Sequence, residues 1–118
     1  MSGISNKQNN FHEPLLNLLK NKASLHNFKT GQTIYYKEHL PYGLFFLIEG
    51  TVQINIKRGK ISKINAPAII GYNSFINMSE YTETAIAYSD CTVYFLSHAG
   101  YKEILSVNPT FDDWLIYY

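Results

Sequence analysis

The fold is decided by residues 44–57, which read LFFLIEGTVQINIK. Residues 44–48 are continuously apolar, which is typical of a strand whose two faces are both buried. Gly50 then breaks the run or allows a bulge. Residues 51–57 alternate between apolar and polar side chains, so one face of this second strand is apolar and the other is wet. The stretch therefore predicts two successive strands, of which only the first is buried on both sides.

Working outward from this pair, further short strands are predicted on both sides. A turn signal at Thr30-Gly31 precedes a β-branched and aromatic run over 33–36. On the C-terminal side, strands are predicted around 61–64 and at 68–70, 84–88 and 92–96, whereas 72–83 loses the β period and 74–78 is expected to form one helical turn. About seven short strands at regular spacing predict a mainly β fold, a jelly-roll-like double sheet.

Short helices are expected to flank the strands. One begins near Pro14 and places leucines 15, 18 and 19 on one face. Another has Ser97 as its N-cap. Asn108-Pro109 opens a last helix, in which an apolar stripe occupies positions i, i+3, i+4 and i+7. The residues of this candidate interaction helix are Phe111, Trp114, Leu115 and Tyr118. Such a face packs on its own domain or on a partner, for instance in a homodimer, and the sequence leaves both open.

Composition limits the class of protein. A chain of 118 residues with 46% hydrophobic and 16% charged residues can build the core of one domain and is not disordered. A net charge of +1 provides no overall field for nucleic acid or a membrane, and the single cysteine excludes an internal disulfide. No apolar run is long enough to span a bilayer, and the polar start lacks a secretory signal, so a cytoplasmic location is expected. The predicted organisation is a disordered tail over 1–10 and one domain over 11–118, with a β-roll at 28–97 and C-terminal helices at 98–118.

In the order and spacing of several pieces, the chain resembles the cyclic-nucleotide-binding domain of the catabolite-activator (Crp/Fnr) superfamily. The pieces are GQTI at 31–34, FFLIEGTV at 45–52, IG at 70–71, TAIA at 84–87, DCTVYFLS at 90–97, IL at 104–105 and NP at 108–109. The resemblance implies a double-stranded β-helix with a phosphate-binding cassette, in which a Gly-Glu pair opens a short helix and an Arg followed by Ser or Thr closes the segment. In that family, helix N–H groups and the Arg neutralise the cyclic phosphate.

The cassette departs from the family pattern at two positions. Gly71 matches the glycine and Thr84-Ala85 the closing pair, but Tyr72 stands at the Glu position and Glu83 at the Arg position. No Lys or Arg lies between Tyr72 and Ala87. Usual binding of cyclic AMP or cyclic GMP is therefore not expected. A third departure is at Glu38-His39, where the family usually carries a turn Gly.

The cassette segment is still the candidate ligand pocket by position. Its candidate residues are Gly71, Tyr72, Asn73, Ser74, Phe75, Glu83, Thr84 and Ala85. Hydroxyls, an amide and one carboxylate suit a neutral or cationic small molecule better than a phosphate. The alternative is that side chains such as Tyr72 and Phe75 fill the pocket and nothing binds.

No catalytic or cofactor motif is present, and no metal site is predicted, because the four histidines are far apart and no two occupy i, i+2 positions on a strand. The basic residues Lys57, Arg58, Lys60 and Lys63 are read as a solvated hairpin tip. The leading hypothesis is a regulatory or sensor domain that acts through an altered ligand or through protein contacts. The alternatives are the effector-sensing half of a Crp/Fnr-type transcription regulator, whose DNA-binding domain lies outside this chain, and a cupin-like enzyme.

Overall fold

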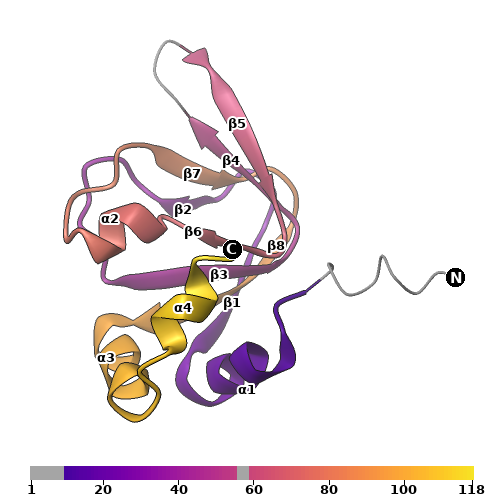
Figure 1. Cartoon of the computed structure of the whole chain (residues 1–118). Coiled ribbons are helices and arrows are strands. Elements are labelled where there is room, and N and C mark those ends of the chain that lie inside the picture. The colour runs from indigo at the N-terminus through magenta and orange to yellow at the C-terminus, as the bar shows by residue number, and fades with distance from the viewer. Residues whose placement is uncertain (1–9, 56–58) are drawn as a thin grey trace, which may run out of the picture.

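Two four-stranded antiparallel sheets stack to form a β-roll in the computed structural model, which describes residues 10–55 and 59–118 (Figure 1). The first sheet has the order β1 (Ser24–Phe28), β8 (Cys91–Ser97), β3 (Gly43–Glu49) and β6 (Ala68–Ile70). The second sheet has the order β2 (Thr33–Tyr35), β7 (Thr84–Ala87), β4 (Thr51–Asn55) and β5 (Ile61–Asn65). The mainly β prediction is confirmed. The predicted tail, apart from Asn10, and residues 56–58 of the basic hairpin lie outside the described residues.

Strand β3 is buried on both faces, as its apolar run predicts. It pairs with β8 on one side and with β6 on the other. Leu44 and Phe46 point towards the helices, whereas Leu47 points towards the second sheet, and all three side chains are fully buried. The strand therefore joins two cores that lie on opposite sides of the first sheet.

Gly50 carries the chain from β3 in the first sheet to β4 in the second. Its φ is +101°, in the left-handed region, and a Cβ added there would lie 2.4 Å from the carbonyl oxygen of Asp90. Only glycine fits this close approach of two backbone segments. In β4 the predicted alternation holds over the described residues, since Val52 and Ile54 are buried and Asn55 is exposed.

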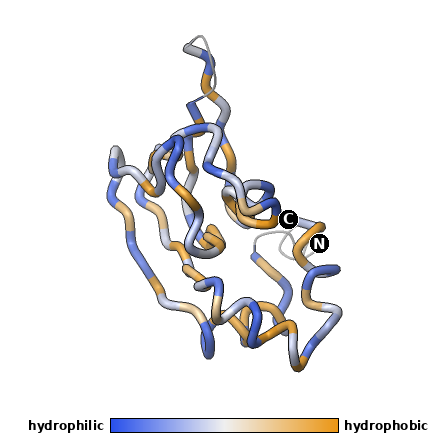
Figure 2. Tube along the Cα trace, turned by 90° about the vertical axis from the view of Figure 1, so that its left-hand side faces the viewer, coloured by the Kyte–Doolittle hydropathy of each residue, from blue (hydrophilic) through white to orange (hydrophobic). Residues whose placement is uncertain are grey.

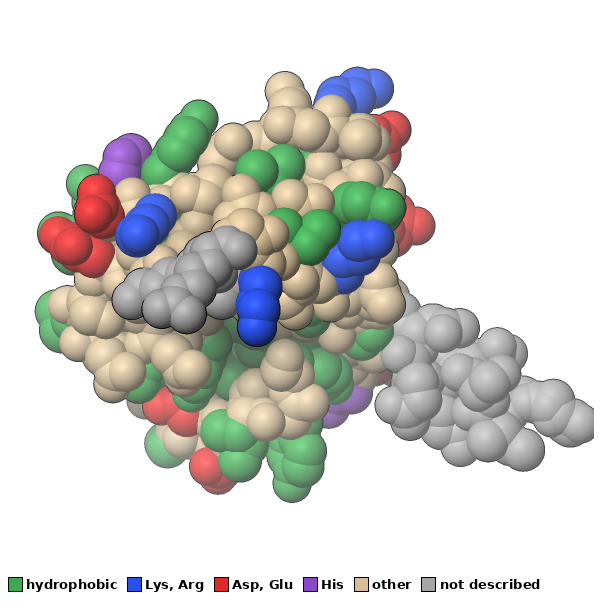
Figure 3. Space-filling view, turned by 90° about the horizontal axis from the view of Figure 1, so that it is seen from above, with side chains coloured by type: hydrophobic (Ala, Val, Ile, Leu, Met, Phe, Trp, Pro, Cys, Tyr) green, Lys and Arg blue, Asp and Glu red, His purple; other side chains and the backbone are tan. Residues whose placement is uncertain are grey.

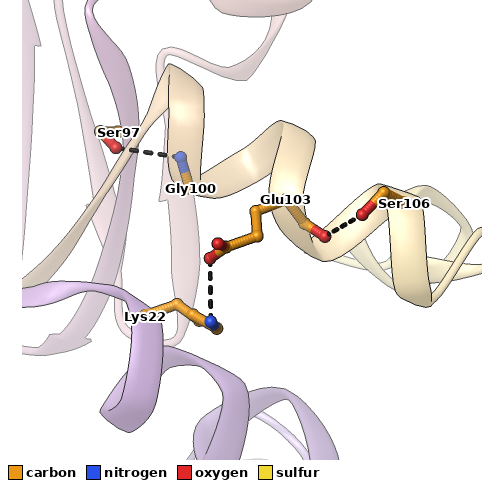
Figure 4. A network of polar contacts seen from close by, with 5 residues as sticks. All are labelled: Lys22, Ser97, Gly100, Glu103 and Ser106. Atoms are coloured by element: carbon orange, nitrogen blue, oxygen red, sulfur yellow. Dashed lines mark hydrogen bonds and ion pairs between the residues drawn. The ribbon is translucent and has the colours of Figure 1, made fainter.

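Four helices complete the domain: α1 (Glu13–Lys22), α2 (Tyr72–Ile76), α3 (His98–Val107) and α4 (Phe111–Leu115). The predicted cap of α3 is confirmed, because the Gly100 N–H donates to Ser97 Oγ at 3.1 Å. Figure 4 shows this cap together with an ion pair of 2.8 Å between Lys22 Nζ of α1 and Glu103 of α3. The ion pair is solvent-exposed and contributes little, so apolar packing determines how these helices dock.

The buried side chains form two groups. The helix-side core lies between the first sheet and helices α1, α2, α3 and α4. The inter-sheet core lies between the two sheets and includes Leu47, Val52, Ala85 and Val93. Figure 2 shows hydrophobic and hydrophilic residues alternating in short runs along the chain, as expected when each strand has an inner and an outer face.

Two elements differ from the prediction. Strand β1 precedes the predicted start of the β-roll at residue 28, because it is a sheet edge with four exposed residues and has no apolar pattern to reveal it. Helix α2 begins two residues before the predicted turn at 74–78. Gly71 adopts a left-handed conformation as its N-cap, and the Gly71 carbonyl accepts from the Phe75 N–H at 3.2 Å.

Candidate functional site

The cassette segment crosses from the first sheet to the second. Strand β6 ends at Ile70, Gly71 turns the chain with φ +75° and ψ +21°, and α2 follows at once. A loop then leads to β7, which begins at Thr84. The backbone of Gly71 is thus placed as the resemblance implies, at the start of a short helix. Thr84 accepts a hydrogen bond through Oγ1 from the Lys37 N–H at 3.1 Å.

The apolar candidates on α2 face away from the inter-sheet core. Phe75 is buried in the helix-side core, with its ring 5.1 Å from Tyr101 in an edge-to-face contact. Tyr72 is half-buried and packs against the same core. Asn73 is exposed, and Ser74 Oγ donates to the Glu80 carbonyl at 3.3 Å. Tyr72 and Phe75 therefore lie on the side of α2 that faces α3, where they line a hollow with Tyr101 and do not lie beside Tyr35.

Two other tyrosines occupy the space next to Gly71. Tyr35 from β2 and Tyr81 from the loop before β7 stack with ring centroids 3.7 Å apart and an interplanar angle of 13°. Both are at least nine-tenths buried. A Cβ added at Gly71 would lie 2.7 Å from Tyr81 Cε1 and 3.2 Å from Tyr35 Cε2. The stacked rings therefore lie against the backbone of the cassette glycine.

The electrostatics of this place are those of a desolvated, slightly acidic site. Burial raises the pKa of Tyr81 to about 12. Burial, followed by the negative charge of Glu83, raises the pKa of Tyr35. Glu83 is half-buried and accepts a short hydrogen bond from Thr82 Oγ1. Both phenols are therefore neutral at pH 7. The charged side chain that acts on Tyr35 is the carboxylate of Glu83.

The structure brings together only part of the predicted site. Gly71 and Ala85 lie beside or within the inter-sheet core, and the charge of Glu83 acts on Tyr35, whereas the α2 side chains face elsewhere. Sequence reasoning missed Tyr35 and Tyr81. An isolated aromatic residue in the polar loop 77–83 was the available signal for Tyr81, whereas Tyr35 belongs to an aromatic run that does not reveal which ring points inward.

A hollow adjoins this tyrosine pair. It has a volume of about 270 Å³ and lies between β2, the loop 36–42, β3 and β8. Six of its lining residues carry phenyl or phenol rings: Tyr35, Tyr36, Tyr42, Phe45, Tyr81 and Phe95.

The candidate interaction helix packs on its own domain. Phe111 and Leu115 are buried in the helix-side core, and Trp114 and Tyr118 are partly buried against it. Of the two alternatives left open by the sequence, the structure shows self-packing for this stripe. The large hydrophobic side chains of this region that stay exposed are Ile116 and Tyr117, which the stripe did not include.

The described residues form no metal site. No group of three His, Cys, Asp or Glu side chains there is placed to hold a metal ion. Cys91 is buried, and its thiol donates to the carbonyl of Thr51, with burial raising its pKa.

Figure 3 shows one face of the molecule, on which basic, acidic and hydrophobic side chains are interspersed. None of the helices in the described ranges is both long and apolar enough to cross a bilayer.

Two stacked sheets joined through a glycine-led helical turn define a β-roll. The chain belongs to the cyclic nucleotide-binding domain family, whose model matches residues 25–108. Domains of this family are generally regulatory and not catalytic. A comparison with curated protein sequences gave no significant match.

Solved structures share the fold at low sequence identity. The catabolite activator protein of Thermus thermophilus is 17% identical with a TM-score of 0.76, and the match covers 89% of this chain and 52% of that one. A cyclic nucleotide-binding domain from Methylobacillus flagellatus is 18% identical with a TM-score of 0.74, covering 90% and 62%. A protein of a cyclic-GMP-dependent signalling pathway in bacterial phytopathogenesis is 12% identical with a TM-score of 0.76, covering 86% and 84%. The chain thus spans about half the length of the Thermus protein.

Proposed function

We propose that this chain is a regulatory domain with a degenerate phosphate-binding cassette, which does not bind cyclic AMP or cyclic GMP in the usual way and acts through an altered ligand or protein contacts. The observation that carries the proposal is the stacked pair of Tyr35 and Tyr81 against Gly71. In the resembling family, the cyclic phosphate approaches the helix start that follows this glycine. Here two buried rings lie at that glycine.

Charge supports the same conclusion. An anion about 4 Å from a carboxylate is disfavoured by roughly 1 kcal/mol in water and by roughly 4 kcal/mol at an intermediate dielectric. Glu83 stands where the family has its Arg, and no basic residue between Tyr72 and Ala87 replaces the lost attraction. A cyclic phosphate would therefore meet repulsion and two rings where the family offers a cation and open backbone.

Thermal unfolding with millimolar cyclic AMP, cyclic GMP and cyclic dinucleotides tests the proposal. A ligand at a hundred times its Kd would add about 2.7 kcal/mol to the folded state, a shift of several degrees in a domain of this size. We expect no shift for the wild-type chain. A shift of the wild-type midpoint with cyclic AMP or cyclic GMP would contradict the proposal, whereas a shift with a cyclic dinucleotide alone would identify an altered ligand.

A restored variant sharpens this experiment. Glu83→Arg combined with Tyr81→Ser removes one ring and returns the cation, so we expect cyclic nucleotides to shift its midpoint. Glu103→Arg on the exposed side of α3 introduces the same charge far from the cassette and is expected to give no shift. Equal shifts in the two variants would mean that nonspecific charge attraction explains the effect.

A second candidate function is the effector-sensing half of a Crp/Fnr-type regulator. The observation that favours it is the structural match to the Thermus catabolite activator protein, of which this chain covers 52%. A reading frame that continues beyond Tyr118 into a DNA-binding domain would support it. A homodimer or protein partner at the C-terminal region would then contact Ile116 and Tyr117, because Phe111 and Leu115 are committed to the core.

A further inference from the structure

The hollow of about 270 Å³ between β2, the loop 36–42, β3 and β8 has a nearly continuous aromatic wall. The ring of Phe45 lies 6.0 Å from Tyr35 and 5.0 Å from Phe95, centroid to centroid. Tyr81 extends this wall through its stack on Tyr35. The phenol pair that lies against Gly71 therefore also forms one side of a separate pocket.

The mouth of this pocket is aromatic and open to solvent. Tyr36 is 54% exposed and Tyr42 is 79% exposed, although both line the hollow. Exposed rings of this size gain apolar contacts when a guest is enclosed between them and the buried wall. The pocket is thus walled by buried rings and edged by rings that a ligand would cover.

The ring faces of the pocket and one acidic neighbour favour a cation. Within the described part of the chain, no Lys or Arg lines the hollow, and His39 is the lining residue that can carry a positive charge. The loop 36–42 holds Lys37 next to Glu38, so these two charges offset one another, whereas the charge of Glu83 reaches Tyr35 on the wall. The faces of Tyr and Phe rings are themselves negative and attract cations placed over them.

The lining also selects the kind of cation. It is largely apolar, and its side-chain acceptors are the tyrosine hydroxyls and the His39 ring, so each of the three N–H groups of a primary ammonium that does not reach one of them costs free energy. A quaternary ammonium has no N–H group, so ring faces alone can surround it. The volume suits a small guest, since it lies just below the range of drug-sized pockets.

We propose that this aromatic pocket binds a small quaternary ammonium cation, enclosed by the rings of Tyr35, Tyr42, Phe45 and Phe95. The site shares Tyr35 and Tyr81 with the place beside Gly71, so the proposal rests on the proposed function in this one respect, that the two rings stay stacked there. The two failures are separable by the ligand used, because choline tests the pocket and cyclic nucleotides test the cassette.

The probe is choline chloride, compared with its neutral isostere 3,3-dimethylbutan-1-ol at matched ionic strength. Shifts of tyrosine and phenylalanine ring signals in NMR titrations give both dissociation constants. We expect saturable binding of choline and at least fivefold weaker binding of the isostere, because only choline carries the charge that ring faces attract. Equal affinity for the two probes, or no saturable binding of choline, would overturn the proposal.

Two exposed tyrosines provide a matched pair of variants. Tyr42→Leu removes a ring at the mouth and keeps an apolar side chain, so we expect choline affinity to fall at least threefold while the folded state is kept. Tyr117→Leu removes an equally exposed ring, 81% accessible, at a different hollow shared with His12 and Trp114, and should leave choline affinity unchanged. Loss of choline binding in Tyr117→Leu with none in Tyr42→Leu would place the cation elsewhere and overturn the assignment.

Discussion

Glu38 has a φ of 74° in the turn between β2 and β3, a conformation that L side chains other than Asn and Asp rarely adopt. The turn is fixed from both sides. The Glu38 N–H donates to the Tyr81 carbonyl, and the His39 carbonyl accepts from the Tyr81 N–H. This is the corner where the resembling family carries a glycine. The structure keeps the glycine-type backbone although the glycine is absent.

We expect Glu38→Gly to stabilise the domain by about 0.5–1 kcal/mol. Relief of the left-handed strain outweighs the larger conformational entropy that glycine gives the unfolded chain. Thermal unfolding should show a midpoint higher by a few degrees. Lys37→Gly, at the preceding residue, is the control and should lower the midpoint, because Lys37 has no positive φ to relieve.

The burial of Tyr81 predicts that the stability of the domain changes with pH in the alkaline range. Burial raises the pKa of folded Tyr81 to about 12, above the ordinary value of 10 in the unfolded chain. Below pH 10 the phenol is neutral in both states and its contribution is fully present. Between pH 10 and 12 the unfolded chain loses the proton and the folded chain keeps it, so stability falls as pH rises.

We therefore expect Tyr81→Phe to flatten the fall of the thermal midpoint between pH 10 and 12. Tyr117→Phe replaces an exposed phenol and serves as the control, with a profile like that of the wild type. Parallel profiles for wild type and Tyr81→Phe would mean that Tyr81 is solvated in the folded chain.

At the scale of elements, α4 is a short helix held by burial. It has only the residues Phe111–Leu115, too few to be stable alone. The ring centroids of Phe111 and of Tyr101 in α3 lie 6.2 Å apart, and the Tyr101 hydroxyl donates to an Asp112 carboxylate oxygen at 2.6 Å. The helix is thus part of the helix-side core and depends on α3 for its place.

Truncation of Phe111 to alanine should lower the free energy of unfolding by about 3–5 kcal/mol, since this side chain is fully buried. Urea denaturation measures the change. Tyr117→Ala, a few residues further on and 81% exposed, should change it by less than about 0.5 kcal/mol. A comparable loss in both variants would argue that the exposed end of this segment, not its buried face, stabilises the fold.

Across the whole molecule, β3 connects the two cores. Phe46 and Leu47 are sequence neighbours, yet one lies in the helix-side core and the other in the inter-sheet core. Because one strand is shared by both, neither core can open without removing a wall of the other. The domain should unfold as one cooperative unit.

Phe46→Ala and Leu47→Ala test this coupling. Each should cost about 2–5 kcal/mol and lower a single, shared transition followed by far-ultraviolet and near-ultraviolet circular dichroism. Two separated transitions in either variant would show that the cores unfold independently.

All strands except β1 were predicted from the sequence, because a continuous apolar run at 44–48 and the alternation that follows it are local consequences of burial on two faces or one. The helix cap at Ser97 and the apolar stripe that begins at Phe111 were likewise predicted from the spacing of residue types. The cassette glycine was identified from the family resemblance, and its left-handed backbone together with the close approach of the Tyr81 ring favours glycine there.

The side chains that lie at that glycine are set by contacts between distant segments, which no local pattern reveals. Tyr35 and Tyr81 are 46 positions apart and meet because β2 and the loop before β7 are brought side by side by sheet pairing. Strand β1 was hidden for the same reason, since backbone pairing to β8 holds an edge of exposed residues. The local sequence pattern indicates whether a side chain is buried or exposed. Contacts between distant segments depend instead on how the strands pair and the sheets stack. The candidate site consists of such contacts.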